Sequence, residues 1–203
     1  MDISAQDRER ISRAIRAAEA RTTGEIVCVL ARSSSDAPAL PILVAAIVAL
    51  ALPWLLVGFT AMTVHRILSV QILVFLALLL ILLLPRVRLA LVPRKARRAV
   101  AHRVAMEQFA IRGIARTKDR SGILIFVSLA EHYARIIADD GISARVAQSE
   151  WQGAIDALVA HMRDGRIAEG FITAIDVCGN ALATHFPRNG ANRDELPDRI
   201  YVI

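Results

Sequence analysis

Two long apolar runs dominate the pattern of hydrophobic and polar positions along the chain. Residues 37–64 contain no charged side chain and neither do residues 67–85, so that only His65 and Arg66 separate the two runs. A helix rises ~1.5 Å per residue and must cover a hydrocarbon core of ~30 Å, which takes about 20 residues. The pattern therefore predicts two membrane-spanning helices joined by a short turn. The predicted elements are a transmembrane helical hairpin at 37–85 with spans at about 39–57 and 67–84.

The flanking segments show shorter periodicities. Apolar residues from Ile3 to Ala18 recur at helical spacing, and Ser4 with Asp7 is similar to a capping box. The run from Gly122 to Leu129 is continuously apolar between polar neighbours, which is typical of a buried central strand. The other predicted elements are a strand at 25–31, a basic helix at about 94–115, a strand at 133–138, and helices around 155–162 and 167–182.

Neither flanking half has a core alone, and the one helix and one strand of the N-terminal half are too few to bury a sheet. We therefore expect a single discontinuous domain, built from residues 1–36 and 86–203, into which the hairpin is inserted. A strand, a crossover helix and a second strand favour parallel pairing of 25–31 with 122–129. The predicted fold class is an α/β (α+β-like) sandwich, a small mixed sheet packed by helices and interrupted by the transmembrane hairpin.

The charge distribution predicts how the hairpin is oriented. The 203 residues are 55% hydrophobic and carry a net charge of +6, but the positive excess is local, because residues 86–120 hold eleven Lys or Arg against two acidic residues. Basic residues beside a span mark its cytoplasmic side, so we expect both termini in the cytoplasm.

The same basic block bears on partners. The expected partner is the lipid bilayer, and the basic block could also bind anionic lipid head groups. We expect no nucleic-acid binding, because no aromatic residues interleave with the basic ones. Gln71, inside the second span, could hydrogen-bond across the hairpin or to another membrane-embedded chain, which leaves the oligomeric state open.

Several short motifs outside the hairpin occur in a recognisable order. They are Thr23-Gly24-Glu25-Ile26, Ser121 to Ser128 followed by Glu131, Ala138 to Ile142, Trp151, His185-Phe186-Pro187 and Glu195-Leu196-Pro197. Together they resemble the TPM-domain proteins, also called TPM phosphatases, in the bacterial branch whose domain is interrupted by two spans. The resemblance implies an α/β sandwich held in the bacterial inner (plasma) membrane. It also implies calcium or another divalent ion, with acid-phosphatase activity in some relatives and an accessory role for membrane complexes in others.

The usual nucleophile motifs of phosphatases are absent from the sequence. Neither Cys28 nor Cys178 begins a Cys-x5-Arg loop, and no Asp-x-Asp pair occurs. Any phosphoryl chemistry would therefore fall to carboxylates and a divalent ion that they hold.

The expected topology brings several carboxylates to one end of the sheet, where the two later strands begin and end. The predicted metal ligands, for calcium or magnesium, are Glu25, Asp119, Asp139 and Asp140. Alternatively, Asp139-Asp140-Gly141 is only a turn, and neighbouring basic residues neutralise Asp119. Glu131 falls at the opposite end of the strand, about 25 Å away at ~3.3 Å per residue, and cannot share this site.

Two functions follow from these patterns. The first is a membrane-anchored TPM-domain protein that acts as an accessory or assembly factor of a membrane complex and binds a divalent cation. The alternative is a divalent-metal-assisted acid phosphatase that hydrolyses phosphomonoesters. A transporter is disfavoured, because neither predicted span carries an ionisable residue.

Overall fold

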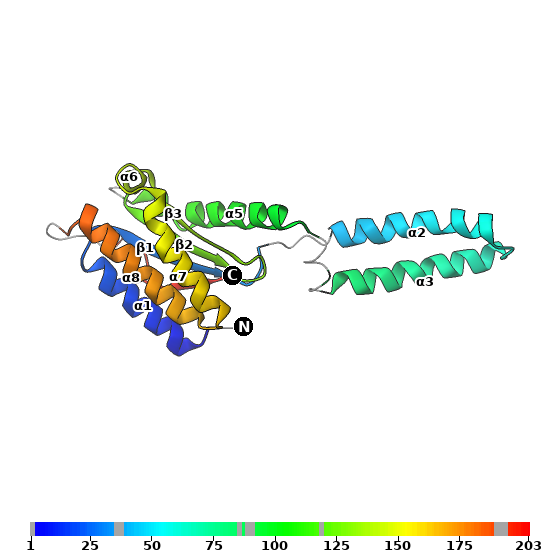
Figure 1. The fold of residues 1–203 in the computed structure, drawn as a ribbon, viewed down its shortest axis with the longest axis horizontal. Helices are drawn as coiled ribbons and strands as arrows, with labels where there is room; N and C mark the ends of the chain where they lie inside the picture. The colour runs from blue at the N-terminus through cyan, green and yellow to red at the C-terminus, as the bar shows by residue number, and fades with distance from the viewer. Residues whose placement is uncertain (1–2, 35–38, 85–86, 88–91, 118–119, 189–194) are drawn as a thin grey trace. The chain divides into compact units, whose positions relative to one another are not determined.

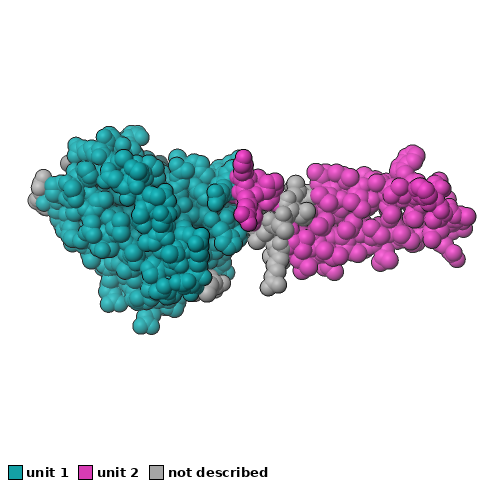
Figure 2. All heavy atoms as spheres, in the orientation of Figure 1, with its two compact units in different colours: residues 1–34, 98–203 teal, residues 35–97 magenta. Residues whose placement is uncertain are grey.

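The structure of the protein is a computed structural model, and it describes residues 3–34, 39–84, 87, 92–117, 120–188 and 195–203. The chain divides into two compact units, residues 1–34 with 98–203 and residues 35–97 (Figure 2). The first unit contains all the described strands, and the second contains two apolar helices.

A four-stranded mixed sheet forms the centre of the first unit, in the order β3-β2-β1-β4 (Figure 1). β1 (Glu25–Ala31) and β2 (Gly122–Ser128) pair in parallel along their full length. β3 (Tyr133–Ala138) is antiparallel to β2, and β4 (Ile200–Val202) is parallel to β1. Every residue of β1 and β2 is buried. The predicted central strand and the predicted parallel pair are both confirmed.

Helices cover both faces of the sheet. They are α1 (Ala5–Glu19), α5 (Arg94–Ile111), α6 (Asp140–Ser143), α7 (Gln152–Arg163) and α8 (Ile167–His185), with 3-10 turns η1 (Ile114–Arg116) and η2 (Gln148–Trp151). Side chains alternate along a strand, so β1 supplies Ile26 and Cys28 to a core shared with α1, α7 and α8, and Val27 and Val29 to a second core shared with α5. The predicted fold class, a small mixed sheet packed by helices, is confirmed.

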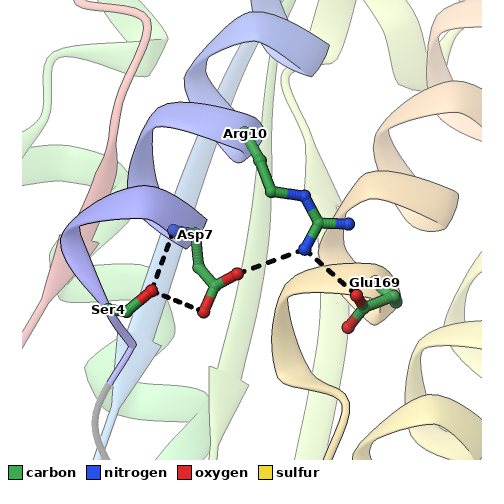
Figure 3. Close-up of polar contacts among 4 residues, drawn as sticks. All are labelled: Ser4, Asp7, Arg10 and Glu169. Atoms are coloured by element: carbon green, nitrogen blue, oxygen red, sulfur yellow. Dashed lines mark hydrogen bonds and ion pairs between the residues drawn. The ribbon is translucent and has the colours of Figure 1, made fainter.

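Polar contacts fix the start of α1 against the first turn of α8 (Figure 3). The Ser4 hydroxyl accepts a hydrogen bond from the Asp7 amide at 3.0 Å and donates one to the Asp7 carboxylate at 2.8 Å. Arg10 then contacts the carboxylates of Asp7 at 3.2 Å and of Glu169 at 3.1 Å. The Ser4 hydroxyl, assisted by Arg10, lowers the pKa of Asp7. The N-cap predicted for Ser4 is therefore present and extends into a contact between two helices.

Three element boundaries differ from the sequence-based prediction. α5 ends at Ile111 rather than 115, because Gly113 adopts a φ of 72° that ends the helix before η1. The predicted turn after β3 is the start of α6, where the Asp139 carboxylate accepts a hydrogen bond from the Asp140 amide at 2.7 Å. β4 was not predicted, since its three residues are too short to show a period.

The second unit consists of α2 (Ala39–Phe59) and α3 (Val64–Leu83), which pack against each other. Both are long and apolar enough to cross a membrane, judged by length and composition. Their large apolar side chains point outward, as in Trp54, whose exposed fraction is 84%, and Phe59, at 86%. α3 begins three residues before its predicted span, and Pro53 lies inside α2.

Gly179 allows α8 to approach α1 closely. A Cβ atom at Gly179 would lie 2.7 Å from the Cβ atom of Ala18. We therefore expect Gly179→Ala to lower the free energy of unfolding by about 1–2 kcal/mol in urea denaturation, because overpacking costs more than the gain in helix propensity. Gly153→Ala is the matched control, since no atom lies within 4 Å of its Cβ position. An equal loss of stability in both variants would contradict this packing.

Candidate functional site

The connection between α1 and β1 is fixed by Thr22, which is fully buried. Its hydroxyl donates to the carbonyl of Phe186 at 2.6 Å and accepts from the amide of Gly24 at 3.1 Å. Thr22 also bridges to Pro187, just after the end of α8. This turn holds Glu19, the last residue of α1, next to the beginning of β1.

Glu19 is a partly buried acid whose pKa is strongly raised. Its carboxylate oxygen accepts a hydrogen bond from the Ile26 amide at 2.7 Å. Burial, together with a hydrogen bond to the carboxyl of Asp198, raises the pKa of Glu19 to about 10. Glu19 therefore keeps its proton at neutral pH.

Glu25 fixes the segment that carries Asp198 to the vicinity of Glu19. The Glu25 side chain is buried, and its carboxylate accepts from the amides of Glu195 at 3.4 Å and Leu196 at 3.3 Å. The Arg199 amide then donates to the Pro197 carbonyl at 2.8 Å, which makes a tight turn directly before β4. Glu25 therefore acts as a positioning residue for the chain that carries Asp198.

One oxygen of Asp198 is left without a partner. The Oδ1 atom is shielded from solvent and makes no hydrogen bond to any described residue. A buried acceptor that makes no hydrogen bond costs about 1–3 kcal/mol, so this oxygen is available to a proton donor or a cation. We refer to Glu19, Glu25 and Asp198 together as the amino-end cluster, because they lie where β1 and β4 begin.

The four residues predicted as metal ligands have different surroundings. Asp119 lies outside the described residues. Asp140 is exposed and pairs with Arg120 at 2.7 Å, while Asp139 is buried at the N-cap of α6 with its Oδ2 atom lacking a hydrogen bond. Glu25 lies at the same end of the sheet as Asp139, but β2 separates the strands that carry them. Within the described ranges, no group of three or more His, Cys, Asp and Glu side chains is placed to hold a metal ion.

The carboxyl ends of β1 and β2 carry a second polar network. Glu131 is 5% exposed and accepts from the Ser33 hydroxyl at 3.1 Å, from the Ser34 amide at 3.0 Å and from the Ser128 hydroxyl. The Ser34 hydroxyl in turn donates to Ser128 at 2.8 Å. The network therefore holds residues 33–34, from which the chain continues towards α2. The register of β2 and β3 confirms the prediction that Glu131 and Asp139 lie at opposite ends of the sheet.

Comparison with known families supports the resemblance found in the sequence. Residues 86–181 match the TPM domain. This range contains β2, β3 and α7, whereas Glu19, Glu25 and Asp198 lie outside it. The TPM-domain resemblance is confirmed for this part of the chain.

A solved structure shares the fold of the whole chain. It is the NMR structure of the BA42 protein from the psychrophilic bacterium Bizionia argentinensis, with a TM-score of 0.64 and 21% sequence identity. The comparison covers 100% of this chain and 97% of that one. No curated protein matches the sequence significantly. The likeness to BA42 shows the fold that surrounds the TPM domain match, and it assigns no activity.

Sequence reasoning missed two members of the amino-end cluster, Glu19 and Asp198. Glu19 occupies a position on α1 that looks like an ordinary exposed helix end, and Asp198 follows a proline in a segment without periodicity. The motif Glu195-Leu196-Pro197 was the one available signal, since it directly precedes Asp198. Only the pairing of β4 with β1 places that motif beside α1 and the TPM domain sheet.

The raised pKa of Glu19 predicts an unusual dependence of stability on pH. The Glu19 pKa is about 10 in the folded chain against an ordinary value of 4.5. Between these values the folded state binds more protons than the unfolded state, so stability is fully present below about pH 4.5 and falls as the pH rises toward 10. Glu19→Gln keeps the oxygen that accepts from Ile26 and cannot ionise. We expect this variant to show a flatter pH profile of Tm and a higher Tm than wild type at pH 8.

The matched control for this measurement is Asp164→Asn. Asp164 is exposed and pairs with Arg166 at 2.8 Å on the surface. Its replacement should leave the slope of Tm against pH unchanged, because exposed ion pairs contribute little. A wild-type slope that persists in Glu19→Gln would show that Glu19 does not hold a proton at neutral pH.

Proposed function

We propose that this chain is a bacterial inner-membrane protein in which α2 and α3 anchor a TPM-type α/β domain. Both helices turn large apolar side chains outward, and each exposed aromatic or aliphatic surface costs about 25 cal/mol per Å² in water. Hydrocarbon chains of a bilayer would cover that surface without this cost. The basic residues that follow α3 favour a cytoplasmic location for both termini.

We propose that the domain serves as an accessory or assembly factor of a membrane complex. The observation that supports this role is that three buried acids of the domain each fix the local backbone by hydrogen bonds. Glu25 holds residues 195–196, Asp139 caps α6, and Glu131 holds residues 33–34. Side chains committed to loop geometry make a surface of fixed shape, which suits docking to another membrane protein.

A divalent cation is part of this proposal, and the number of carboxyl groups in the amino-end cluster favours magnesium over calcium. Calcium takes six to eight oxygen ligands, whereas magnesium keeps several waters and binds through one or two carboxylates. Glu19 and Asp198 offer two carboxyl groups in contact, and Asp198 Oδ1 has no competing partner. This donor set fits a hydrated magnesium ion that replaces the proton of Glu19. The quartet Glu25, Asp119, Asp139 and Asp140 stays a prediction, since Asp119 is outside the described residues.

The alternative function, a metal-assisted acid phosphatase, would use the same cation. Magnesium at Glu19 and Asp198 would neutralise the charge of a bound phosphomonoester. Both functions therefore predict cation binding, and only the phosphatase predicts hydrolysis of a phosphomonoester.

Magnesium titration of the detergent-purified full chain tests the cation, and hydrolysis separates the two functions. We expect magnesium at 100 times its dissociation constant to stabilise wild type by about 2.7 kcal/mol in thermal shift. Asp198→Asn should abolish this stabilisation, whereas Asp164→Asn should retain it. An accessory role predicts no magnesium-dependent hydrolysis of p-nitrophenyl phosphate, and turnover that Asp198→Asn abolishes would establish the phosphatase instead. Equal magnesium stabilisation in all three proteins would place the ion elsewhere.

A reporter fused to the C-terminus, after β4, tests the anchoring and its orientation. With two spans and a cytoplasmic C-terminus, fused green fluorescent protein should be fluorescent and fused alkaline phosphatase inactive, because the latter needs the periplasm to form its disulfides. The same reporters fused at Met62, between α2 and α3, should give the opposite pattern. An active alkaline phosphatase at the C-terminus would contradict the proposed orientation.

A further inference from the structure

α5 begins with an unusual concentration of positive charge. Five basic residues, here called the basic segment, occur within its first ten positions, and no acidic residue appears in this helix before Glu107. The members of the basic segment are Arg94, Lys95, Arg97, Arg98 and Arg103. Its first buried residue is Ala101, so the first two turns of the helix have no buried face.

The charges of the basic segment are not neutralised within the described residues. Other arginines of the domain form ion pairs, as Arg10 does with Glu169 and Arg120 with Asp140. None of the five residues of the basic segment makes an ion pair with a described residue, and the Nε atom of Arg97 is shielded from solvent without a hydrogen-bond acceptor.

This arrangement is unfavourable for an isolated helix. The amino end of a helix carries a partial positive charge, which acidic residues stabilise and basic residues oppose. Arg94 also lies three and four positions before Arg97 and Arg98, where like charges on one helix face repel. An anionic partner would remove both penalties at once.

The position of the basic segment in the chain indicates which anion it meets. Arg94 follows Leu83, the last residue of α3, by eleven positions, and a chain of that length reaches at most about 40 Å. If α3 spans the bilayer, as in the proposed function on which this inference rests, the chain length keeps the start of α5 within reach of the lipid head groups. Nucleic acid is disfavoured, because Phe109, the one Phe, Tyr or Trp of α5, is buried under the sheet and cannot stack on bases.

We propose that the basic segment of α5 binds the phosphate groups of anionic lipids, so that the domain prefers a bilayer surface rich in phosphatidylglycerol over a zwitterionic one. Each basic residue near such a surface contributes about 1 kcal/mol, equivalent to about fivefold in association. The attraction is screened by salt, with a range of about 10 Å at 0.1 M ionic strength.

The test uses the full chain reconstituted in phosphatidylcholine bilayers with trace spin-labelled lipid. Electron paramagnetic resonance gives the fraction of labelled lipid that the protein immobilises. We expect phosphatidylglycerol to associate at least about fivefold more strongly than phosphatidylcholine, with the ratio falling as salt is raised. The variant Arg94→Gln/Lys95→Gln/Arg98→Gln/Arg103→Gln should bring the ratio close to one.

The matched control removes four exposed arginines elsewhere in the domain. It is the variant Arg8→Gln/Arg13→Gln/Arg16→Gln/Arg163→Gln, which changes the net charge equally and should keep the wild-type ratio. A ratio near one in wild type, or an equal fall in both variants, would overturn the lipid inference while leaving the anchoring intact. Oligonucleotide binding by the basic segment together with a ratio near one would overturn it in favour of nucleic acid. Failure of the protein to immobilise either lipid would instead refute the proposed anchoring.

Discussion

Parallel pairing of β1 with β2 is the interaction on which the rest of the structure depends. Glu25 lies opposite Gly122, 97 positions later in the chain, and the register continues without interruption to the ends of both strands. β1 also pairs with β4, so its hydrogen bonds join three of the four strands of the sheet. Its side chains enter the cores on both faces of the sheet. Without this pairing, neither part of the sequence could bury its apolar residues.

The pairing is compatible with a long insertion, because the entropic cost of closing a loop rises only slowly with its length. Each doubling of loop length adds only about 0.6 kcal/mol to the entropy cost. The buried apolar side chains of β1 each contribute about 1.5–3 kcal/mol, which exceeds that cost several times over. Two apolar helices can therefore lie between β1 and β2 in the sequence without disturbing the sheet. Parallel strands also begin at one edge of a sheet and end at the opposite edge. For this reason Glu19, Glu25 and Asp198 lie together at one edge. Glu131 contacts Ser33 and Ser34 at the other.

Much of this fold could be predicted from the periodicity of apolar residues and from residues that begin or end helices and strands. The apolar run of β2, the Ser4 cap of α1 and the long apolar runs of α2 and α3 can each be predicted from the local sequence. The parallel pairing followed from the order of elements, since a strand, a helix and a strand favour it. The end of α5 was misplaced because Gly113 weakens a helical pattern in sequence without showing that its φ becomes positive.

The candidate site was harder to predict than the fold. Asp139 and Asp140 were grouped as ligands because the expected topology places them at one end of the sheet, yet one caps α6 and the other pairs with Arg120. Glu19 and Asp198 have no distinctive sequence context and meet through β4, which is three residues long. Long-range pairing of short strands and the protonation of buried acids depend on tertiary packing, which no local pattern reveals.

Native-state hydrogen exchange of the full chain tests the central claim most directly. If β1 and β2 join the two parts of the sequence into one cooperative domain, the amides of Val27 and Val29 should exchange with the same opening free energy as those of Leu124 and Phe126. That free energy should equal the global free energy of unfolding of the domain. Exchange of the β1 amides at a clearly lower free energy, with β2 still protected, would show that the domain holds together without the pairing and would contradict the account.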